Sequence, residues 1–139
     1  MKSLALRFSD NFAPKSGTIE EHKKIINSKG YVWYGKVGNK ISAKILDGIL
    51  ANGPVRILLI KSSSSERYWA TVEAYSYERQ TIHPSYYDSN IDNMHVWLKI
   101  TKIEIAEDGV LEKCTTSTGK KLSDIYKKSM GSYFCIDFE

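Results

Sequence analysis

The sequence lacks the short motifs by which most enzymes and metalloproteins are recognised. It has no GxSxG, Walker A or HExxH motif and no GxGxxG after a strand, which removes the common signatures of hydrolases, nucleotide-binding enzymes and zinc proteases. The histidines His22, His83 and His95 are scattered, and none has a carboxylate or cysteine at metal-ligand spacing. We therefore predict no metal and no cofactor, and a binding protein rather than an enzyme.

Cysteines and long apolar runs are also scarce. The two cysteines, Cys114 and Cys135, have no CxxC spacing, so free thiols in a reducing compartment are expected. No run approaches the roughly 18 apolar residues of a transmembrane helix. The first residues, MKSLALR, lack the apolar centre of a signal peptide. These absences predict a cytoplasmic protein with no membrane partner.

The composition is otherwise that of an ordinary globular domain. A chain of 139 residues is predicted to form a single domain, residues 1–139, that is long enough to bury a core. Two features are unusual: the three tryptophans and nine tyrosines, and a net charge of +4. The excess of positive charge favours a polyanionic partner without requiring one.

The most strongly patterned part of the chain is a predicted hairpin. Val55–Lys61 is a nearly continuous run of β-branched and leucine residues, typical of a strand buried on both faces. After a serine-rich turn, Tyr68–Tyr77 alternates with a period of two. One face of this second strand is predicted to carry Trp69, Thr71, Glu73, Tyr75 and Tyr77. Such a mixture of aromatic and polar side chains predicts a surface that binds something flat.

The clearest helix signal covers residues 18–29. The letters TIEE predict a capping box with Thr18 as the N-cap and Glu21 as its partner, and Gly30 is a natural end. The other predicted elements are strands at 4–8, 31–37, 95–106, 110–115 and 132–138 and helices at 42–51 and 121–130. Residues 78–94 show no periodicity, and connections of that length are usually functional or mobile.

These elements predict an α+β fold. Roughly five or six strands and about three helices are interleaved without strict βαβ alternation. We therefore expect a curved mixed sheet or small barrel with helices around it.

The aromatic side chains in the strands suggest a binding site. Trp33 and Tyr34 lie in one predicted strand and Trp69 in another. Their ordinary role would be packing between sheet and helices. Alternatively, two or three of them converge at one mouth of the barrel as a cage, in which a base stacks for roughly 1–3 kcal/mol per ring.

A base-binding cage also needs polar groups at its edge and cations around it. Candidates for reading the base edge are Ser63 and its neighbours in the 62–65 turn, Thr71, Asp88 and Asn90. Candidates for holding phosphates are Lys36, Lys40, Lys61, Arg67, Arg79 and Lys99. A merely solvated rim is the alternative role for these charges.

Several segments together resemble a known family. They are GTIEEHKKIINSKGYVWYGK, the hairpin ILLIKSSSSERYWATVEAY and the strand HVWLKI. Their order is similar to that of PUA-like domains of the EVE and YTH type, and more narrowly to N-terminal specificity domains of McrB-type modification-dependent restriction proteins. The resemblance implies a curved barrel of five or six strands and a methylated adenine or cytosine flipped into an aromatic pocket. It points to Trp33, Tyr34 and Trp69, with Tyr86 or Tyr87 from the long loop.

The resemblance also implies partners. The domain would be the N-terminal part of a larger protein, and a GTP-driven motor and a partner nuclease would lie outside these residues. Because RNA-binding relatives share the architecture, both DNA and RNA stay open as ligands.

Two other functions compete with nucleic-acid recognition. Tyrosine and tryptophan enrichment equally suits a module that docks a protein partner. A small hydrolase or nuclease acting through His83 and Asp88 in the long loop is the third possibility.

Overall fold

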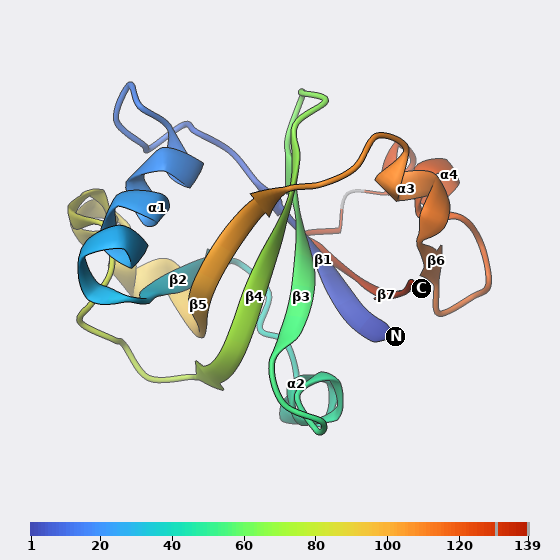
Figure 1. The fold of residues 1–139 in the computed structure, drawn as a ribbon, viewed down its shortest axis with the longest axis horizontal. Helices are drawn as coiled ribbons and strands as arrows, with labels where there is room; N and C mark the ends of the chain where they lie inside the picture. Colours follow the sequence, from blue (N-terminus) through green and yellow to red (C-terminus); the bar gives the residue numbers. More distant parts are fainter. Residues whose placement is uncertain (130, 139) are drawn as a thin grey trace.

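The protein has a mixed α+β fold built on one strongly curved sheet. The computed structural model describes residues 1–129 and 131–138, and its seven strands follow the order β2-β5-β4-β3-β1-β7-β6. Among the strands of these described residues, β1 and β3 alone pair in parallel, and all other neighbours are antiparallel. The predicted curved mixed sheet with surrounding helices is therefore confirmed, with more strands than expected (Figure 1).

The strands are β1 Lys2–Phe8, β2 Val32–Val37, β3 Val55–Lys61, β4 Arg67–Ser76, β5 Met94–Ile105, β6 Thr115–Thr116 and β7 Tyr133–Asp137. The helices are α1 Thr18–Lys29, α2 Ala43–Ile49, α3 Val110–Lys113 and α4 Leu122–Tyr126, with the short 3-10 helices η1 Ser85–Ser89 and η2 Ile91–Asn93. Across the described part of the chain, no helix is both long and apolar enough to cross a lipid bilayer.

Helix α1 has the predicted bounds but not the predicted cap. Gly30 ends it in the left-handed conformation, with φ of 87°, and donates its N–H to the Ile26 carbonyl. At the other end the N-cap is Gly17, so the expected Thr18 capping box is wrong. The Thr18 N–H instead donates to the Asp10 carboxylate at 3.0 Å. A side chain from the preceding loop therefore takes over the capping role.

Three predictions for the second half of the chain need correction. Residues 110–115 were expected as a strand, but Val110–Lys113 forms a helical turn after Gly109, whose left-handed φ of 73° redirects the chain. The last helix ends at Tyr126 instead of running to 130, and Met130 lies outside the described residues. Residues 78–94, expected to have no regular structure, contain the two 3-10 helices.

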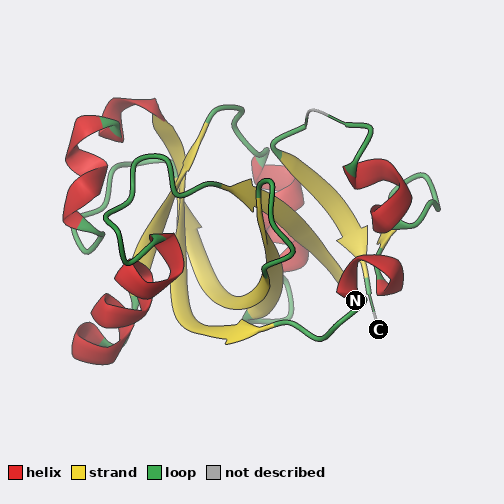
Figure 2. Ribbon diagram, turned by 90° about the horizontal axis from the view of Figure 1, so that it is seen from above, coloured by secondary structure: helices red, strands yellow, loops and turns green. Residues whose placement is uncertain are grey.

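Two hydrophobic clusters cover opposite faces of the sheet. The first contains Leu4, Leu59 and Leu98 and is closed by side chains of α1 and α2. The second contains Leu58 and Trp69 and is closed by α3 and α4. Figure 2 shows how the curved strands separate the helices into groups on different sides. The prediction that β3 is buried on both faces is confirmed for residues 57–60.

The expected single aromatic face of β4 is wrong. Register shifts against β5 fall between Thr71 and Val72 and between Val72 and Ala74. The first leaves Thr101 of β5 unpaired, and the second leaves Glu73 of β4 unpaired. The one extra residue in β4 turns the side chains that follow it to the opposite face relative to a strict two-residue period. As a result Tyr75 and Tyr77 pack on the first cluster, whereas Trp69 belongs to the second.

The long connection between β4 and β5 covers the free edge of β2. The Trp33 N–H donates to the Ile82 carbonyl at 2.7 Å, and the Gly35 N–H donates to the Tyr87 hydroxyl at 3.3 Å. An edge strand needs such partners for its outward N–H groups. This covering brings η1, with Tyr86 and Tyr87, beside β2.

Candidate functional site

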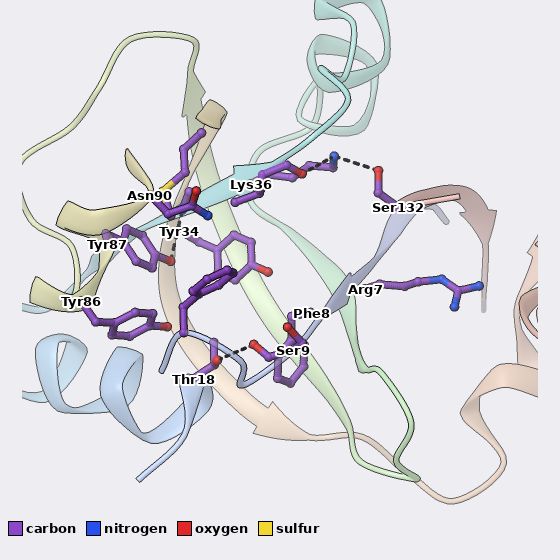
Figure 3. A pocket seen from close by; sticks show the side chains of 14 residues that line it. Arg7, Phe8, Ser9, Thr18, Tyr34, Lys36, Tyr86, Tyr87, Asn90 and Ser132 are labelled. Carbon is purple, nitrogen blue, oxygen red and sulfur yellow. Dashed lines mark hydrogen bonds between the residues drawn. The ribbon is translucent and has the colours of Figure 1, made fainter. Parts of the chain in front are cut away.

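A cavity of about 230 Å³ lies where the end of β1, the start of α1, β2 and η1 meet (Figure 3). Its lining residues are Arg7, Phe8, Ser9, Phe12, Thr18, Tyr34, Gly35, Lys36, Val37, Tyr86, Tyr87, Asn90, Met94 and Ser132. Cavities for drug-sized ligands usually measure roughly 300–1,000 Å³. This one therefore suits a ligand, or a part of a ligand, of about one planar ring system.

Aromatic rings form much of the cavity wall. Tyr34 comes from β2, and Tyr86 and Tyr87 come from η1, where their rings meet edge to face with centroids 5.2 Å apart. Phe8 closes the wall from β1. Phe12, in the loop before α1, is 67% exposed although it lines the cavity. An exposed phenylalanine at a cavity is available to a ligand, which would bury it.

A buried hydrogen-bond network holds Tyr87 in place. The Thr18 carbonyl can only accept, so the Nδ1 of His22 donates to it across 2.7 Å. The other ring nitrogen, Nε2, must then accept from the Tyr87 hydroxyl, which lies 2.5 Å away. The Tyr87 oxygen in turn accepts from the Gly35 N–H. His22 thus connects α1, η1 and β2, and burial lowers the pKa of its imidazole to about 4.

The three tyrosines of the cavity are neutral phenols at physiological pH. Burial raises the pKa of Tyr34, and the neighbouring Tyr86 adds to the rise. Burial likewise raises the pKa values of Tyr86 and Tyr87. The cavity therefore offers aromatic faces and uncharged hydrogen-bonding groups.

The two cationic side chains in the lining direct their charges elsewhere. The Lys36 ammonium donates to the Asn39 carbonyl at 2.6 Å and to the Ser132 hydroxyl at 3.0 Å, and burial lowers its pKa. One Arg7 nitrogen donates to the carbonyls of Tyr126 and Ser129, each at 2.6 Å. In Figure 3 both side chains extend away from the tyrosines. These charges join β1 and β2 to residues 126–132 and do not face a ligand bound among the rings.

Five of the residues predicted from the sequence come together at this cavity: Tyr34, Lys36, Tyr86, Tyr87 and Asn90. Asp88 lies beside them in η1 but is exposed and is not part of the lining. Trp33 is half-buried, and as the neighbour of Tyr34 in β2 it lies on the opposite face of that strand. Its predicted role in the same cage as Tyr34 is therefore not supported by its position.

The predicted convergence of Trp69 with Tyr34 is wrong. Trp69 is 3% exposed and belongs to the second cluster, on the other face of the sheet. Its ring lies against Phe138, with centroids 4.5 Å apart, and its Nε1 donates to Glu107 at 2.8 Å. The alternation along β4 suggested an aromatic binding face, but the extra residue at Glu73 turns the rings before and after it to different sides.

The remaining predicted residues lie away from the cavity lining. Ser63 is at the tip of the β3–β4 hairpin, with φ of 59°. Arg67 donates to the carbonyls of Ser64 and Glu66. Arg79 forms an exposed ion pair with Asp92. These side chains stay available to a larger surface but not to the interior of the site.

Sequence reasoning missed part of the lining. The main omissions are Phe8, Ser9, Phe12, Thr18 and Met94. Phe12 could have been noticed as the one aromatic residue within the polar loop 9–17. Thr18 was interpreted as a helix cap, Phe8 carries no signal beyond its place in a strand, and Met94 was assigned to the connection 78–94 although it begins β5. Asn90, suggested as a reader of a base edge, does line the cavity.

No catalytic arrangement is found in the part of the chain that is described. The Nδ1 of His83 lies 2.8 Å from the Pro84 carbonyl, and its ring stacks on Tyr87, while Asp88 is exposed. Burial raises the pKa of Cys114 to about 11, opposite to the shift that activates a thiol. Residues 1–129 and 131–138 contain no group of three or more His, Cys, Asp or Glu side chains placed to hold a metal ion.

Comparison with known proteins identifies the family. A family model described as Pua-like matches residues 4–129. No curated protein and no solved structure matches the chain. The match supports the predicted PUA-like domain and does not extend to the EVE, YTH or McrB-type groups. Domains of this kind are generally binding modules, and the family suggests binding of nucleic acid. The match over nearly the whole chain, on a curved mixed sheet with helices at both faces, shows that this chain belongs to the Pua-like family.

Proposed function

We propose that this domain binds nucleic acid by taking a single unstacked base into the cavity between β1, α1, β2 and η1. The observation that carries the proposal is the cavity itself, whose wall is formed by Phe8, Tyr34, Tyr86 and Tyr87. Among its described lining residues, the two cationic side chains are bonded elsewhere and do not face these rings. Neutral aromatic walls suit a base and disfavour a phosphate, which needs donors with positive charge.

The energies are compatible with extraction of one base. Unstacking a base costs a few kcal/mol, least for a base that is already single-stranded or mismatched. Stacking on each aromatic side chain returns roughly 1–3 kcal/mol. Two or three rings in the cavity therefore offset the cost. The net positive charge of the chain adds attraction for the phosphates outside the cavity.

We further propose that the preferred base is methylated. The lining contains apolar side chains, Phe8, Val37 and Met94, beside the tyrosines. If a methyl group on the base packed against these side chains, its burial would add about 0.8 kcal/mol to the binding free energy. Reading a modified base would make the domain a specificity module for a restriction system, with its motor and nuclease supplied by other polypeptide segments.

Fluorescence anisotropy tests both levels of the proposal. Short labelled DNA and RNA, single- and double-stranded, with and without methylated adenine or cytosine, would be titrated with the protein at low and moderate salt. We expect one class of strand to bind with a preference for the methylated base. Uniform binding that disappears with salt would reject the base-reading cavity and leave only a basic surface.

A matched pair of variants locates the binding site. Phe12 and Ile105 are both exposed large apolar side chains, 67% and 80% respectively, but only Phe12 lines the cavity. We expect Phe12→Ala to weaken binding about fivefold to tenfold, because one stacking or covering ring is lost. Ile105→Ala should bind like the wild type. Equal affinities for the two variants would place the nucleic acid elsewhere. If the wild type binds no nucleic acid at all, a protein partner becomes the better hypothesis.

A further inference from the structure

We propose that the hydroxyl group of Tyr34 reads the hydrogen-bonding edge of the bound base, whereas Tyr87 contributes only its ring. This inference rests on the proposed function, because it assigns different roles to two tyrosines of the same cavity. It would make Tyr34 a determinant of ligand specificity.

The hydroxyl group of Tyr87 has no proton left to donate to a ligand edge, and its oxygen already accepts one hydrogen bond. It donates to the Nε2 of His22 at 2.5 Å and accepts from the Gly35 N–H at 3.3 Å. The direction of the first bond follows from the Thr18 carbonyl, which leaves His22 Nε2 as an acceptor. A ligand that took this hydroxyl would break a bond inside a buried network, at a cost of about 1–3 kcal/mol.

Tyr34 is in the opposite situation. Its side chain is only 7% exposed, it lines the cavity, and its hydroxyl has no hydrogen-bond partner in residues 1–129 and 131–138. Figure 3 shows the ring of Tyr34 in the middle of the lining, with no dashed line from its oxygen. A phenol this deeply buried normally finds a partner in the protein. Here the open side of the hydroxyl faces the cavity, so a ligand is the group that can satisfy it.

Two other hydroxyls of the lining are already engaged, and those of Ser9, which is exposed, and Tyr86, which is half-buried, lie nearer the surface than Tyr34. The hydroxyl of Thr18 donates to the Ser9 carbonyl at 3.1 Å. The hydroxyl of Ser132 accepts from Lys36. Among these groups Tyr34 combines depth in the cavity with an unused hydroxyl. Asn90, half-buried and bonded to Asn93 at 2.6 Å, offers its remaining amide groups from nearer the surface.

The protonation state of Tyr34 suits this role. Burial raises the pKa of the phenol, so that it stays neutral and can donate to a ring nitrogen or carbonyl of a base. A site that offers a buried hydrogen bond discriminates against ligands that lack the matching atom, because the protein group is then left unpaired. One neutral hydrogen bond corresponds to about a tenfold difference in affinity.

Two matched substitutions test the assignment, because each removes one oxygen atom and keeps the ring. Tyr34→Phe should weaken binding of the best strand from the anisotropy panel about tenfold and leave the urea midpoint of unfolding nearly unchanged. Tyr87→Phe should lower the urea midpoint, because His22 and Gly35 lose their partner, and should change the affinity of the folded protein by less than about twofold. The affinities are compared at a temperature at which both variants are folded.

Base analogues identify the atom that Tyr34 reads. The preferred strand would be made with analogues that each lack one edge atom of the target base, and every analogue would be titrated with wild type and Tyr34→Phe. If an analogue lacks the atom that bonds to Tyr34, the losses of binding free energy caused by the analogue and by Tyr34→Phe should not add, because both remove the same hydrogen bond. Strict additivity for every edge atom would overturn the assignment.

The outcomes separate the two proposals. Binding by the wild type with unchanged affinity of Tyr34→Phe overturns the role of the hydroxyl and leaves the base-binding function standing. A larger loss of affinity in Tyr87→Phe than in Tyr34→Phe reverses the assignment and also overturns it. Absence of nucleic-acid binding by the folded wild type rejects the proposed function, and the role of Tyr34 with it.

Discussion

Individual side chains near the cavity owe their roles to partners that are distant in the sequence. His22 and Tyr87 are 65 positions apart, yet their hydrogen bond joins a helix to the long connection between two strands. The sequence showed a histidine on a helix and a tyrosine pair in a loop. Nothing local indicated that they meet, because hydrogen-bond partners of this kind are set by the packing of whole elements.

The buried imidazole of His22 predicts a pH dependence of stability. Its pKa is about 4 in the folded protein, where burial disfavours the charged form, and near the ordinary 6.5 when unfolded. Between these values the unfolded chain binds more protons, so stability falls as the pH decreases from 6.5 towards 4. We expect His22 to contribute a loss of about 2 kcal/mol between pH 7.5 and pH 5, measured by urea unfolding.

A pair of histidine variants isolates this contribution. His22→Gln cannot titrate and should lose less stability over the same pH interval, even if it is less stable at pH 7.5. His95 is exposed, so His95→Gln is the matched control for replacing a histidine outside the buried network. Parallel pH profiles for wild type and His22→Gln would show that other groups are responsible.

At the scale of elements, the loop between β1 and α1 organises one side of the cavity. Asp10 accepts the Thr18 N–H and forms an ion pair with Lys61 at 3.0 Å. Burial alone would raise the pKa of Asp10, but these two interactions lower it. The same loop carries Phe12 and Ser9 to the cavity. A carboxylate outside the helix thus fixes both the helix start and part of the site.

Replacement of two acidic residues distinguishes this cap from the capping box that the sequence suggested. Asp10→Ala should destabilise the protein by about 1 kcal/mol, as loss of a helix cap commonly does. Glu21→Ala should cost less than about 0.5 kcal/mol, because Glu21 bonds to Ser16 and Lys24 at the surface and not to the helix end. The free energy of unfolding in urea measures both. A larger loss for Glu21→Ala would restore the capping box.

At the scale of the whole molecule, the two clusters make stability and binding separable. Trp69 packs in the second cluster and the cavity opens beside the first. We expect Trp69→Phe to lower the free energy of unfolding by about 1–3 kcal/mol, through the smaller ring and the lost bond to Glu107. Its affinity for nucleic acid should equal that of the wild type when measured on folded protein. A specific loss of affinity would return Trp69 to the binding site.

The overall charge predicts how binding responds to salt. If phosphates contact the basic surface while a base occupies the neutral cavity, log K should fall linearly with log salt, with a slope of roughly −0.7 per phosphate on a single strand. Tyr34→Phe should shift this line without changing its slope, because the hydroxyl contacts no phosphate. Anisotropy titrations at four salt concentrations measure both quantities. A changed slope would mean that the variant alters the backbone contacts.

The amino-acid sequence by itself determined the elements whose signals are local. The helix at 18–29 with its Gly30 end, the strand at 55–61 and the α+β class follow from periodicity and from the freedom of glycine at positive φ. The resemblance, and not periodicity, pointed to Tyr86 and Tyr87 of the long connection, and both line the cavity.

Only the tertiary structure decided which aromatic residues share a face. The bulge at Glu73 of β4 separates Trp69 from Tyr75, and the covered edge of β2 brings Tyr87 beside Tyr34. A single-sequence pattern assumes a constant period, whereas bulges and edge contacts arise when a curved sheet packs on both faces. The Tyr34 hydroxyl, which has no hydrogen-bond partner among the residues that the structure describes, is likewise a property of the packed molecule.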